Sequence, residues 1–167
     1  MAENDGNGHT WVNIAENGFG ISVFNRTTST MKTFFDNAGE LADKITPCET
    51  LEALIETIEK PRTIILMVPA GTAVDEQIAT LRPFLDADDM IVDAGNANFN
   101  DTNRRASEAA AAGVPFLGIG VSGGEEGARY GPSIMGGGPE ESWNRVAHIL
   151  TAISATYEGN ACATWMG

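Results

Sequence analysis

The chain has 167 residues, 43% of them hydrophobic, which is enough for one domain with a hydrophobic core. A net charge of −13 at pH 7 disfavours nucleic acid as a partner, because phosphate binding needs a basic surface. No apolar run approaches the roughly 20 residues that span a bilayer, and the acidic N-terminus MAENDGNGHT is unlike a signal peptide. We therefore expect a cytoplasmic protein with neither a membrane nor a nucleic-acid partner.

The cysteines and histidines give no indication of a metal site. Cys48 and Cys162 lack CxxC spacing, so we expect reduced, unpaired thiols. His9 and His148 have no neighbours at the spacing of metal ligands.

Short apolar runs alternate along the chain with longer stretches of helical periodicity. The apolar runs predict strands at Gly20–Phe24, Thr63–Val68, Met90–Gly95 and Pro115–Val121, with a short fifth near Thr156–Tyr157. The stretches between them predict helices over residues 29–38, 49–60, 73–85, 101–113 and 139–154. We expect Thr28 or Ser29 and Asp101 to act as helix caps, and Pro139 to lie in a first helical turn.

This alternation predicts an α/β fold with a mostly parallel, doubly wound sheet and helices on both faces. Ligands of such sheets bind beyond the carboxyl ends of the strands. The residues that follow each predicted strand are therefore the first candidates for a binding site.

The first predicted strand is followed by Asn25, Arg26 and Thr27. At this position of a dinucleotide-binding fold, an arginine accommodates the 2′-phosphate of NADP, whereas an acidic residue holds the free ribose hydroxyl of NAD. The guanidinium fork suits a phosphate. A solvated turn without a ligand is the alternative for these three residues.

The next two strands end in turns that contain Pro69, Gly71 and Asn96. Proline and glycine form a tight turn, and an asparagine in a loop is either a turn former or a side chain that donates and accepts hydrogen bonds.

Seven of the eighteen residues from Val121 to Gly138 are glycine. Such a segment is either a flexible linker or a place where backbone approaches a ligand closely. Ser122, Gly123 and Gly124 directly follow a predicted buried strand, and Tyr130, Ile134 and Met135 are unusual in a linker. We therefore favour the close approach of backbone N–H groups to a ligand.

Five segments together resemble 6-phosphogluconate dehydrogenase: NRTTS, VPAGTAVD, DAGNANFNDTNRR, GVSGGEEGARYGPSIM and CATWMG. The resemblance covers the family's NADP-binding, Rossmann-like domain, from about Asn13 to the last residue. It implies NADP as cofactor and the oxidative decarboxylation of 6-phosphogluconate to ribulose 5-phosphate, a reaction of the pentose phosphate pathway. It implies cofactor contacts from Asn25, Arg26, Thr27, Val68, Pro69, Ala70 and Asn96. It implies substrate contacts from Asn96, Ser122, Gly123 and Gly124.

The chain also departs from the family pattern. The apolar first strand and glycine-rich turn of the family are missing, and Gly6 and Gly8 have no strand before them. The neighbours of that strand would then expose their edges. The family's helical domain, with its catalytic lysine and glutamate and its homodimer interface, has no counterpart in residues 1–167. We expect no catalytic residue, and negligible turnover from this chain alone, because a base must lie within hydrogen-bond reach of its proton.

Other functions remain open at this point. The chain could bind NADP or a sugar acid without catalysis, or fold and associate without a ligand. A β-hydroxyacid dehydrogenase relative would share the sheet and the SGG loop, although the continuation EEGARYGPS favours the first family.

Overall fold

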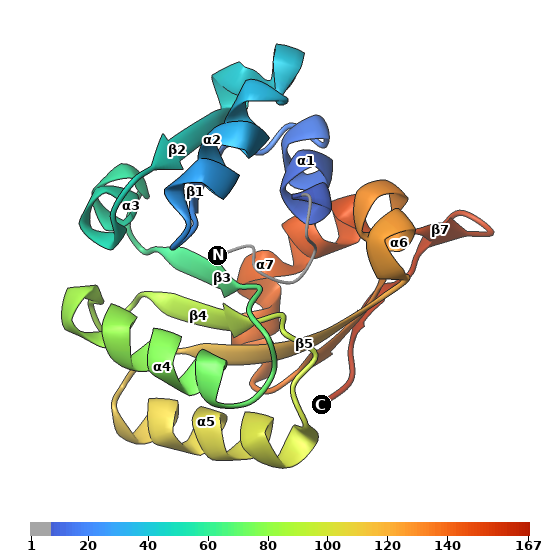
Figure 1. The fold of residues 1–167 in the computed structure, drawn as a ribbon. Coiled ribbons are helices and arrows are strands. Elements are labelled where there is room, and N and C mark those ends of the chain that lie inside the picture. The colour runs from blue at the N-terminus through green and yellow to red at the C-terminus, as the bar shows by residue number, and fades with distance from the viewer. Residues whose placement is uncertain (1–7) are drawn as a thin grey trace.

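The structure is a computed structural model that describes residues 8–167 (Figure 1). Its helices are α1 His9–Glu16, α2 Thr28–Asp36, α3 Leu51–Thr57, α4 Thr72–Leu81, α5 Phe99–Ala111, α6 Gly124–Tyr130 and α7 Glu140–Ile153, with 3₁₀ turns η1 Gly39–Lys44 and η2 Arg82–Phe84. Its strands are β1 Ile21–Phe24, β2 Ile45–Cys48, β3 Thr63–Leu66, β4 Met90–Asp93, β5 Phe116–Ser122, β6 Ser133–Gly137, β7 Thr156–Tyr157, β8 Asn160–Ala161 and β9 Ala163–Trp165.

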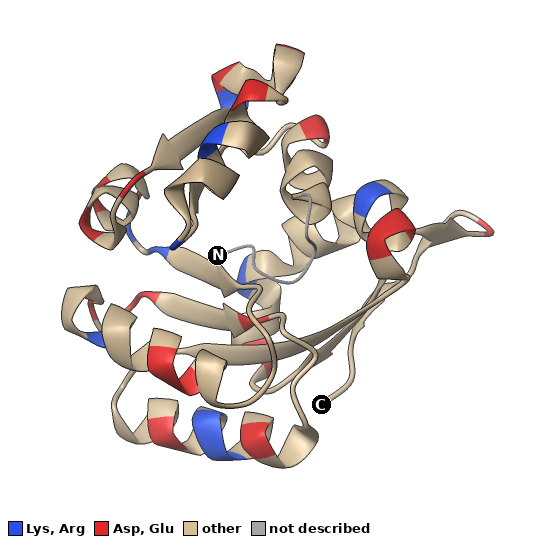
Figure 2. Ribbon diagram, viewed as in Figure 1, with Lys and Arg blue, Asp and Glu red and all other residues tan. Residues whose placement is uncertain are grey.

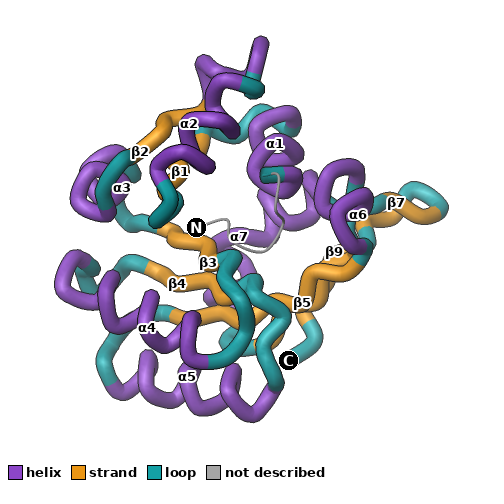
Figure 3. The backbone as a smooth tube through the Cα atoms, viewed as in Figure 1, coloured by secondary structure: helices purple, strands orange, loops and turns teal. Residues whose placement is uncertain are grey.

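The main sheet has five strands in the order β3-β4-β5-β6-β9 (Figure 3). The pairs β3/β4, β4/β5 and β6/β9 are parallel, whereas β5 and β6 are antiparallel. Helices α4 and α5 cover one face of this sheet, and α7 covers the other (Figure 1). The predicted doubly wound α/β architecture is therefore confirmed.

Alternate residues of the central strands supply two separate cores. Met90 and Val92 belong to the core on the side of α1 and α7, whereas Ile91 packs with residues of α4 and α5 on the opposite face. This follows from the two-residue period of a strand, and it explains why β4 is apolar along its whole length.

Strands β1 and β2 form a second, parallel sheet of their own. Within residues 8–167, β1 pairs with β2 and β3 pairs with β4, but no strand joins β1 to β3. Among the described residues, β1 and β2 thus lie in a sheet separate from the one that contains β3 and β4. Helix α1 links the parts, because the Asn13 side chain donates to the carbonyl oxygens of Ala128 in α6 (3.2 Å) and Ile153 in α7 (2.9 Å).

The four long predicted strands are present, each within a residue or two at its ends in most cases. The short fifth strand is also present as β7, but it forms a hairpin with β8 outside the main sheet. Strands β2, β6, β8 and β9 were not predicted. The run of β2 contains Pro47, which argues against a strand except at a sheet edge, and β2 has a single strand partner in the described residues.

Three helix starts differ from expectation. Helix α2 begins at Thr28 with Thr27 as its N-cap residue, so neither Thr28 nor Ser29 is the cap. Helix α5 is capped by Asn98, whose side chain accepts from the N–H of Asn100, and Asp101 lies inside the first turn. Pro139 is the N-cap of α7 rather than a first-turn residue. In each case the chain enters the helix one to three residues earlier or later than its composition indicates.

Candidate functional site

The loops that follow β3 and β4 touch each other at the carboxyl edge of the sheet. Val68 is fully buried, and its carbonyl oxygen lies 2.5 Å from where a Cβ on Gly95 would stand. Real Cβ atoms do not approach a carbonyl so closely, so only glycine fits at position 95. Pro69 and Ala70 are exposed beside this contact. The predicted cofactor residues Val68, Pro69 and Ala70 therefore lie next to the loop that carries Asn96.

One buried arginine holds these two loops together. Arg105 of α5 is 2% exposed, and its guanidinium contacts Asp93 at the end of β4 (3.3 Å) and Asp75 of α4 (2.7 Å). It also donates to the carbonyl oxygen of Gly71, the N-cap of α4, at 2.8 Å. Both strand-end loops are thus tied to one side chain.

The carboxylates around Arg105 differ in their surroundings. Burial raises the pKa of Asp93 above its ordinary value, against the opposing effects of the Gly95 N–H and Arg105. The hydrogen bond from Arg105 lowers the pKa of Asp75, and Arg104 adds to this effect. The ionised form of Asp93 therefore depends on the nearby guanidinium of Arg105, which offsets the cost of burying the carboxylate.

Asn96 connects the β4 loop to β5. Its side chain makes two hydrogen bonds to the backbone of Val121: Nδ2 donates to the carbonyl oxygen at 3.0 Å, and Oδ1 accepts from the N–H at 2.8 Å. Its φ is +54°, a left-handed conformation that asparagine tolerates better than most residues. Asn96 therefore lies immediately beside the end of β5, where Ser122 follows Val121.

The residues Ser122, Gly123 and Gly124 form the turn from β5 into α6. Ser122 ends β5 and is exposed. Gly123 has a φ of +139°, and a Cβ there would stand 2.8 Å from Cα of Gly127. The glycine-rich segment is thus not a linker: it forms the ordered elements α6 and β6. The structure brings Asn96 and the SGG turn together, as the sequence predicts.

Asn25, Arg26 and Thr27 lie at the end of β1, in the smaller sheet. Asn25 is buried, and its Oδ1 accepts a hydrogen bond from the N–H of Thr27 at 2.8 Å, which closes the turn into α2. Arg26 and Thr27 are exposed. The first turn of α2 directs backbone N–H groups toward this turn, and a helix N-terminus favours an anion.

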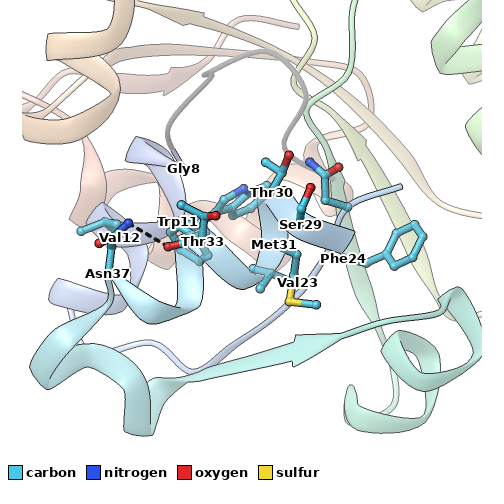
Figure 4. Close-up of a pocket in the computed structure, with 12 residues that line it drawn as sticks. Gly8, Trp11, Val12, Val23, Phe24, Ser29, Thr30, Met31, Thr33 and Asn37 are labelled. Carbon is cyan, nitrogen blue, oxygen red and sulfur yellow. Dashed lines mark hydrogen bonds between the residues drawn. The ribbon is translucent and has the colours of Figure 1, made fainter. Parts of the chain in front are cut away.

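A cavity of about 350 Å³ opens beside the same turn (Figure 4). Trp11, Met31 and Phe34 form its apolar part, and Asn25, Ser29 and Thr30 its polar part. An apolar cavity with a few polar groups is the usual form of a small-molecule site. Gly8, which has no predicted strand before it, is the N-cap of α1 at the cavity wall; Gly6 lies outside the described residues.

Each of the chain's three lysines has a partner among the described residues. Lys32 pairs with Glu49 (3.3 Å), and Lys60 pairs with Asp86 (2.5 Å). The Lys44 ammonium donates to the carbonyl oxygen of Ala15 at 3.2 Å.

Acidic residues are spread over several elements, including α3, α4, α5 and α6 (Figure 2). The described residues hold no group of three or more His, Cys, Asp or Glu side chains that could bind a metal. Cys48 and Cys162 are free thiols, as predicted. Among residues 8–167 there is no helix with the length and hydropathy needed to cross a membrane.

The family model of the NAD-binding domain of 6-phosphogluconate dehydrogenase matches residues 8–167. The chain belongs to this family. The decarboxylating 6-phosphogluconate dehydrogenase of Aggregatibacter actinomycetemcomitans is 48% identical to it over 157 residues, which are 93% of this chain and 32% of the relative. The NADP(+)-dependent, decarboxylating enzyme of Bacillus subtilis is 45% identical over 156 residues, 93% of this chain and 33% of the relative. The chain thus spans about a third of the length of these curated relatives.

Solved structures support the same family. The 6-phosphogluconate dehydrogenase of Plasmodium falciparum superposes with a TM-score of 0.90 at 37% identity, over 95% of this chain and 34% of that one. A 3-hydroxyisobutyrate dehydrogenase of Mycobacterium tuberculosis reaches a TM-score of 0.75 at 17% identity, over 96% of this chain and 50% of that one, which shows a shared fold alone. The family in question is therefore 6-phosphogluconate dehydrogenase rather than a β-hydroxyacid dehydrogenase relative.

Sequence reasoning missed Arg105 and Trp11. Arg105 lies four residues before Ala109, and both face the sheet; an arginine on the buried face of an amphipathic helix is the pattern that could have revealed it. Trp11 precedes the first predicted strand in a segment to which we assigned no element.

Proposed function

We propose that this chain binds NADP and is the cofactor-binding part of an enzyme that oxidatively decarboxylates 6-phosphogluconate to ribulose 5-phosphate. The family match and the names of the relatives in Bacillus subtilis and Plasmodium falciparum, which specify NADP, support this proposal. The observation that carries it is the composition of the β1–α2 turn, where an arginine stands beside a helix N-terminus and a half-apolar cavity.

Arg26 is proposed to bind the 2′-phosphate of NADP, with Asn25 and Thr27 holding the adenosine ribose. The residues present fit this group: the cavity offers an apolar wall and the hydroxyls of Ser29 and Thr30, while the turn offers a guanidinium and backbone N–H groups. A local set of donors can bind an anion in spite of the chain's negative net charge. When bound, NADP supplies the hydride acceptor of the reaction.

Val68, Pro69 and Ala70 are proposed to line the cofactor farther along the strand ends. Asn96 is proposed to face both cofactor and substrate, and Ser122, Gly123 and Gly124 to bind the sugar acid. The two hydrogen bonds between Asn96 and Val121 support this grouping, because they fix the β4 loop beside the SGG turn. Catalysis by a lysine base is assigned to a part of the enzyme outside residues 1–167, in accord with the engaged lysines of this chain.

The proposal also covers the protein's cellular compartment and its partners. We place it in the cytoplasm, without nucleic acid as a partner because of its net charge of −13. The family resemblance implies a homodimer of the whole enzyme.

The test is a titration of the ¹⁵N-labelled chain with NADP⁺, followed by amide NMR. We expect the amides of residues 25–30 and 68–71 to shift in a saturable manner. Shifts confined to other parts of the chain, or none at millimolar NADP⁺, would show that this turn does not bind the cofactor. The variant Arg26→Ala should weaken these shifts. Its charge-matched control is Arg104→Ala, which removes an exposed arginine that contacts Asp75 on α4 and Glu108 on α5 and should leave the shifts unchanged.

A further inference from the structure

The residues proposed to hold NADP lie at the ends of strands in two separate sheets. Asn25, Arg26 and Thr27 follow β1 in the smaller sheet, whereas residues 68–71 follow β3 in the main sheet. We call residues 68–71 the β3 turn. The first set is proposed to hold the 2′-phosphate and the adenosine ribose, and the β3 turn to line the cofactor farther along. A contact that fixes only the β3 turn should therefore affect one part of the cofactor and not the other.

The β3 turn has little packing of its own. Pro69 and Ala70 are exposed, and Gly71 is half-buried with a φ of +103°, in the range that favours glycine. Glycine has more backbone freedom to lose than any other residue, so a fixed turn at this position depends on a contact that holds it. Arg105 of α5 makes such a contact, because its Nη2 donates to the carbonyl oxygen of Gly71 at 2.8 Å.

Arg105 also reaches the β3 turn by a second route. Its Nη1 donates to Oδ2 of Asp93 at 3.3 Å, and Oδ1 of the same carboxylate accepts the N–H of Gly95 at 3.0 Å. Gly95 in turn lies against the carbonyl oxygen of Val68, which leaves no room for a Cβ at position 95. Arg105 therefore holds the β3 turn at both of its ends.

The geometry of these contacts requires an arginine. The guanidinium makes four hydrogen bonds to three segments of the chain, since its Nε and Nη2 also donate to Asp75 of α4 at 2.7 and 3.2 Å. Its planar fork offers five N–H groups in fixed directions, whereas a lysine ammonium is a compact point charge. A lysine at position 105 would keep the positive charge but could not span the three segments.

We propose that Arg105 is a positioning residue for the cofactor: by fixing the β3 turn, it sets the affinity for the part of NADP that lies beyond the adenosine 2′-phosphate. The side chain of Arg105 is 1% exposed, so it acts through the β3 turn and does not touch the cofactor itself. This inference rests on the proposed function, in which the β3 turn lines NADP. The two parts of the cofactor site are thus held by different contacts, and a substitution at Arg105 separates them.

The experiment compares two ligands by calorimetry with the full 167-residue chain. NADP⁺ carries both parts of the cofactor, whereas adenosine 2′,5′-bisphosphate lacks the nicotinamide half. The measured quantity is the ratio of their dissociation constants. Partial unfolding raises both apparent constants by the same factor and cancels in this ratio. A merely structural role of Arg105 would therefore leave the ratio unchanged, whereas a positioning role changes it.

Two variants test this role. Arg105→Met is combined with Asp93→Asn, so that no unpaired carboxylate is buried, and Arg105→Lys keeps the charge without the planar fork. In both variants we expect the advantage of NADP⁺ over the bisphosphate to fall about fivefold or more, the factor that corresponds to one lost hydrogen bond. The matched control is Arg104→Met, because Arg104 is 43% exposed and contacts carboxylates of α4 and α5; it should leave the ratio unchanged.

Failure of this inference is distinguishable from failure of the proposed function. An unchanged ratio in either Arg105 variant, or a ratio near one in the unmodified chain, would overturn the positioning role while the binding of NADP⁺ stands. An equal fall of the ratio in Arg104→Met would also overturn it, because the effect would then not depend on contacts to the β3 turn. An unmodified chain that binds neither ligand contradicts the proposed function, and the positioning role with it.

Discussion

Replacing Arg105 with methionine should destabilise the chain far more than the same change at Arg104. The two arginines are neighbours on α5 and both contact Asp75. They differ in burial, since the side chain of Arg104 is 43% exposed and that of Arg105 is 1% exposed. Methionine keeps most of the volume of the arginine stem, so the comparison isolates the guanidinium.

The magnitude follows from what each variant leaves behind. Arg105→Met leaves the carboxylate of Asp93, 2% exposed, without its cation, and it leaves the Gly71 carbonyl without a donor. Removing one partner of a buried ion pair costs about 3–5 kcal/mol. Arg104→Met breaks exposed pairs with Asp75 and Glu108, each worth about 0.2–1 kcal/mol. A domain of this kind is stable by about 5–15 kcal/mol, so the Arg105 variant loses a large part of its stability.

The assay is urea unfolding followed by circular dichroism at pH 7. We expect Arg105→Met to lower the free energy of unfolding by at least 2 kcal/mol more than Arg104→Met does, an estimate taken from the buried and exposed ion-pair ranges. Asp93→Asn in the Arg105→Met background should restore part of the loss, because it removes the unpaired buried charge. Equal effects of the two arginine variants, or no rescue by Asp93→Asn, would refute the assignment of Arg105 as the residue that holds the strand-end loops.

Three other outcomes follow from the same contacts. Gly95→Ala should cost about 1–3 kcal/mol, because its Cβ meets a carbonyl oxygen at 2.5 Å, whereas Gly20→Ala, with no atom within 4 Å, should be nearly neutral in the same urea assay. Asn96→Gly keeps the left-handed backbone but removes the two bonds to Val121, so hydrogen exchange at the Val121 amide should accelerate about fivefold, equivalent to about 1 kcal/mol. The hydrogen bond from Arg105 lowers the pKa of Asp75 below its ordinary value near 3.8, so this contribution to stability is present above that value. It is lost as the pH falls below about 3.8 and through the lowered pKa, so the amount by which Asp75→Asn lowers the urea midpoint at pH 7 should shrink there; an undiminished effect of Asp75→Asn at low pH would contradict this sign.

Hydrophobic periodicity was sufficient to predict the main strands and helices. Strand β4 and the first four residues of β5 are buried on both faces and form continuous apolar runs, and β3 alternates between half-buried and buried residues. Periodicity failed to predict the segments that become strands only through their contacts with other parts of the fold. Strand β2 carries a proline that only an edge position tolerates, and β9 is a short segment that becomes a strand through its pairing with β6. Because α6 and β6 are rich in glycine, the sequence indicated a loop there. In β6 the glycine is needed for packing, since a Cβ on Gly136 would stand 2.3 Å from the Trp143 ring.

The sequence indicates which candidate residues follow the strands, but it does not indicate the contacts that hold them in place. Strand ends indicate where a ligand binds, so Asn96 and Ser122 could be grouped before the structure was known. Asn96 makes its hydrogen bonds to the backbone of Val121, 25 residues later in the chain. Arg105 contacts Asp75, 30 residues earlier. A local sequence pattern does not predict contacts between residues so far apart, because these contacts form only when the strands pair into the sheet.

The central claim is that the turn of Asn25, Arg26 and Thr27 recognises NADP. The most direct measurement is the ratio of the dissociation constants for NAD⁺ and NADP⁺, obtained by calorimetry at low salt with the unmodified chain and with Arg26→Ala. A charged hydrogen bond to the 2′-phosphate is worth about 1.5–3 kcal/mol, or roughly 10- to 150-fold in affinity. We predict that the chain prefers NADP⁺ by at least the lower of these factors and that Arg26→Ala abolishes the preference while leaving NAD⁺ affinity nearly unchanged. Equal affinity for the two cofactors, or a preference that survives in Arg26→Ala, would contradict the account.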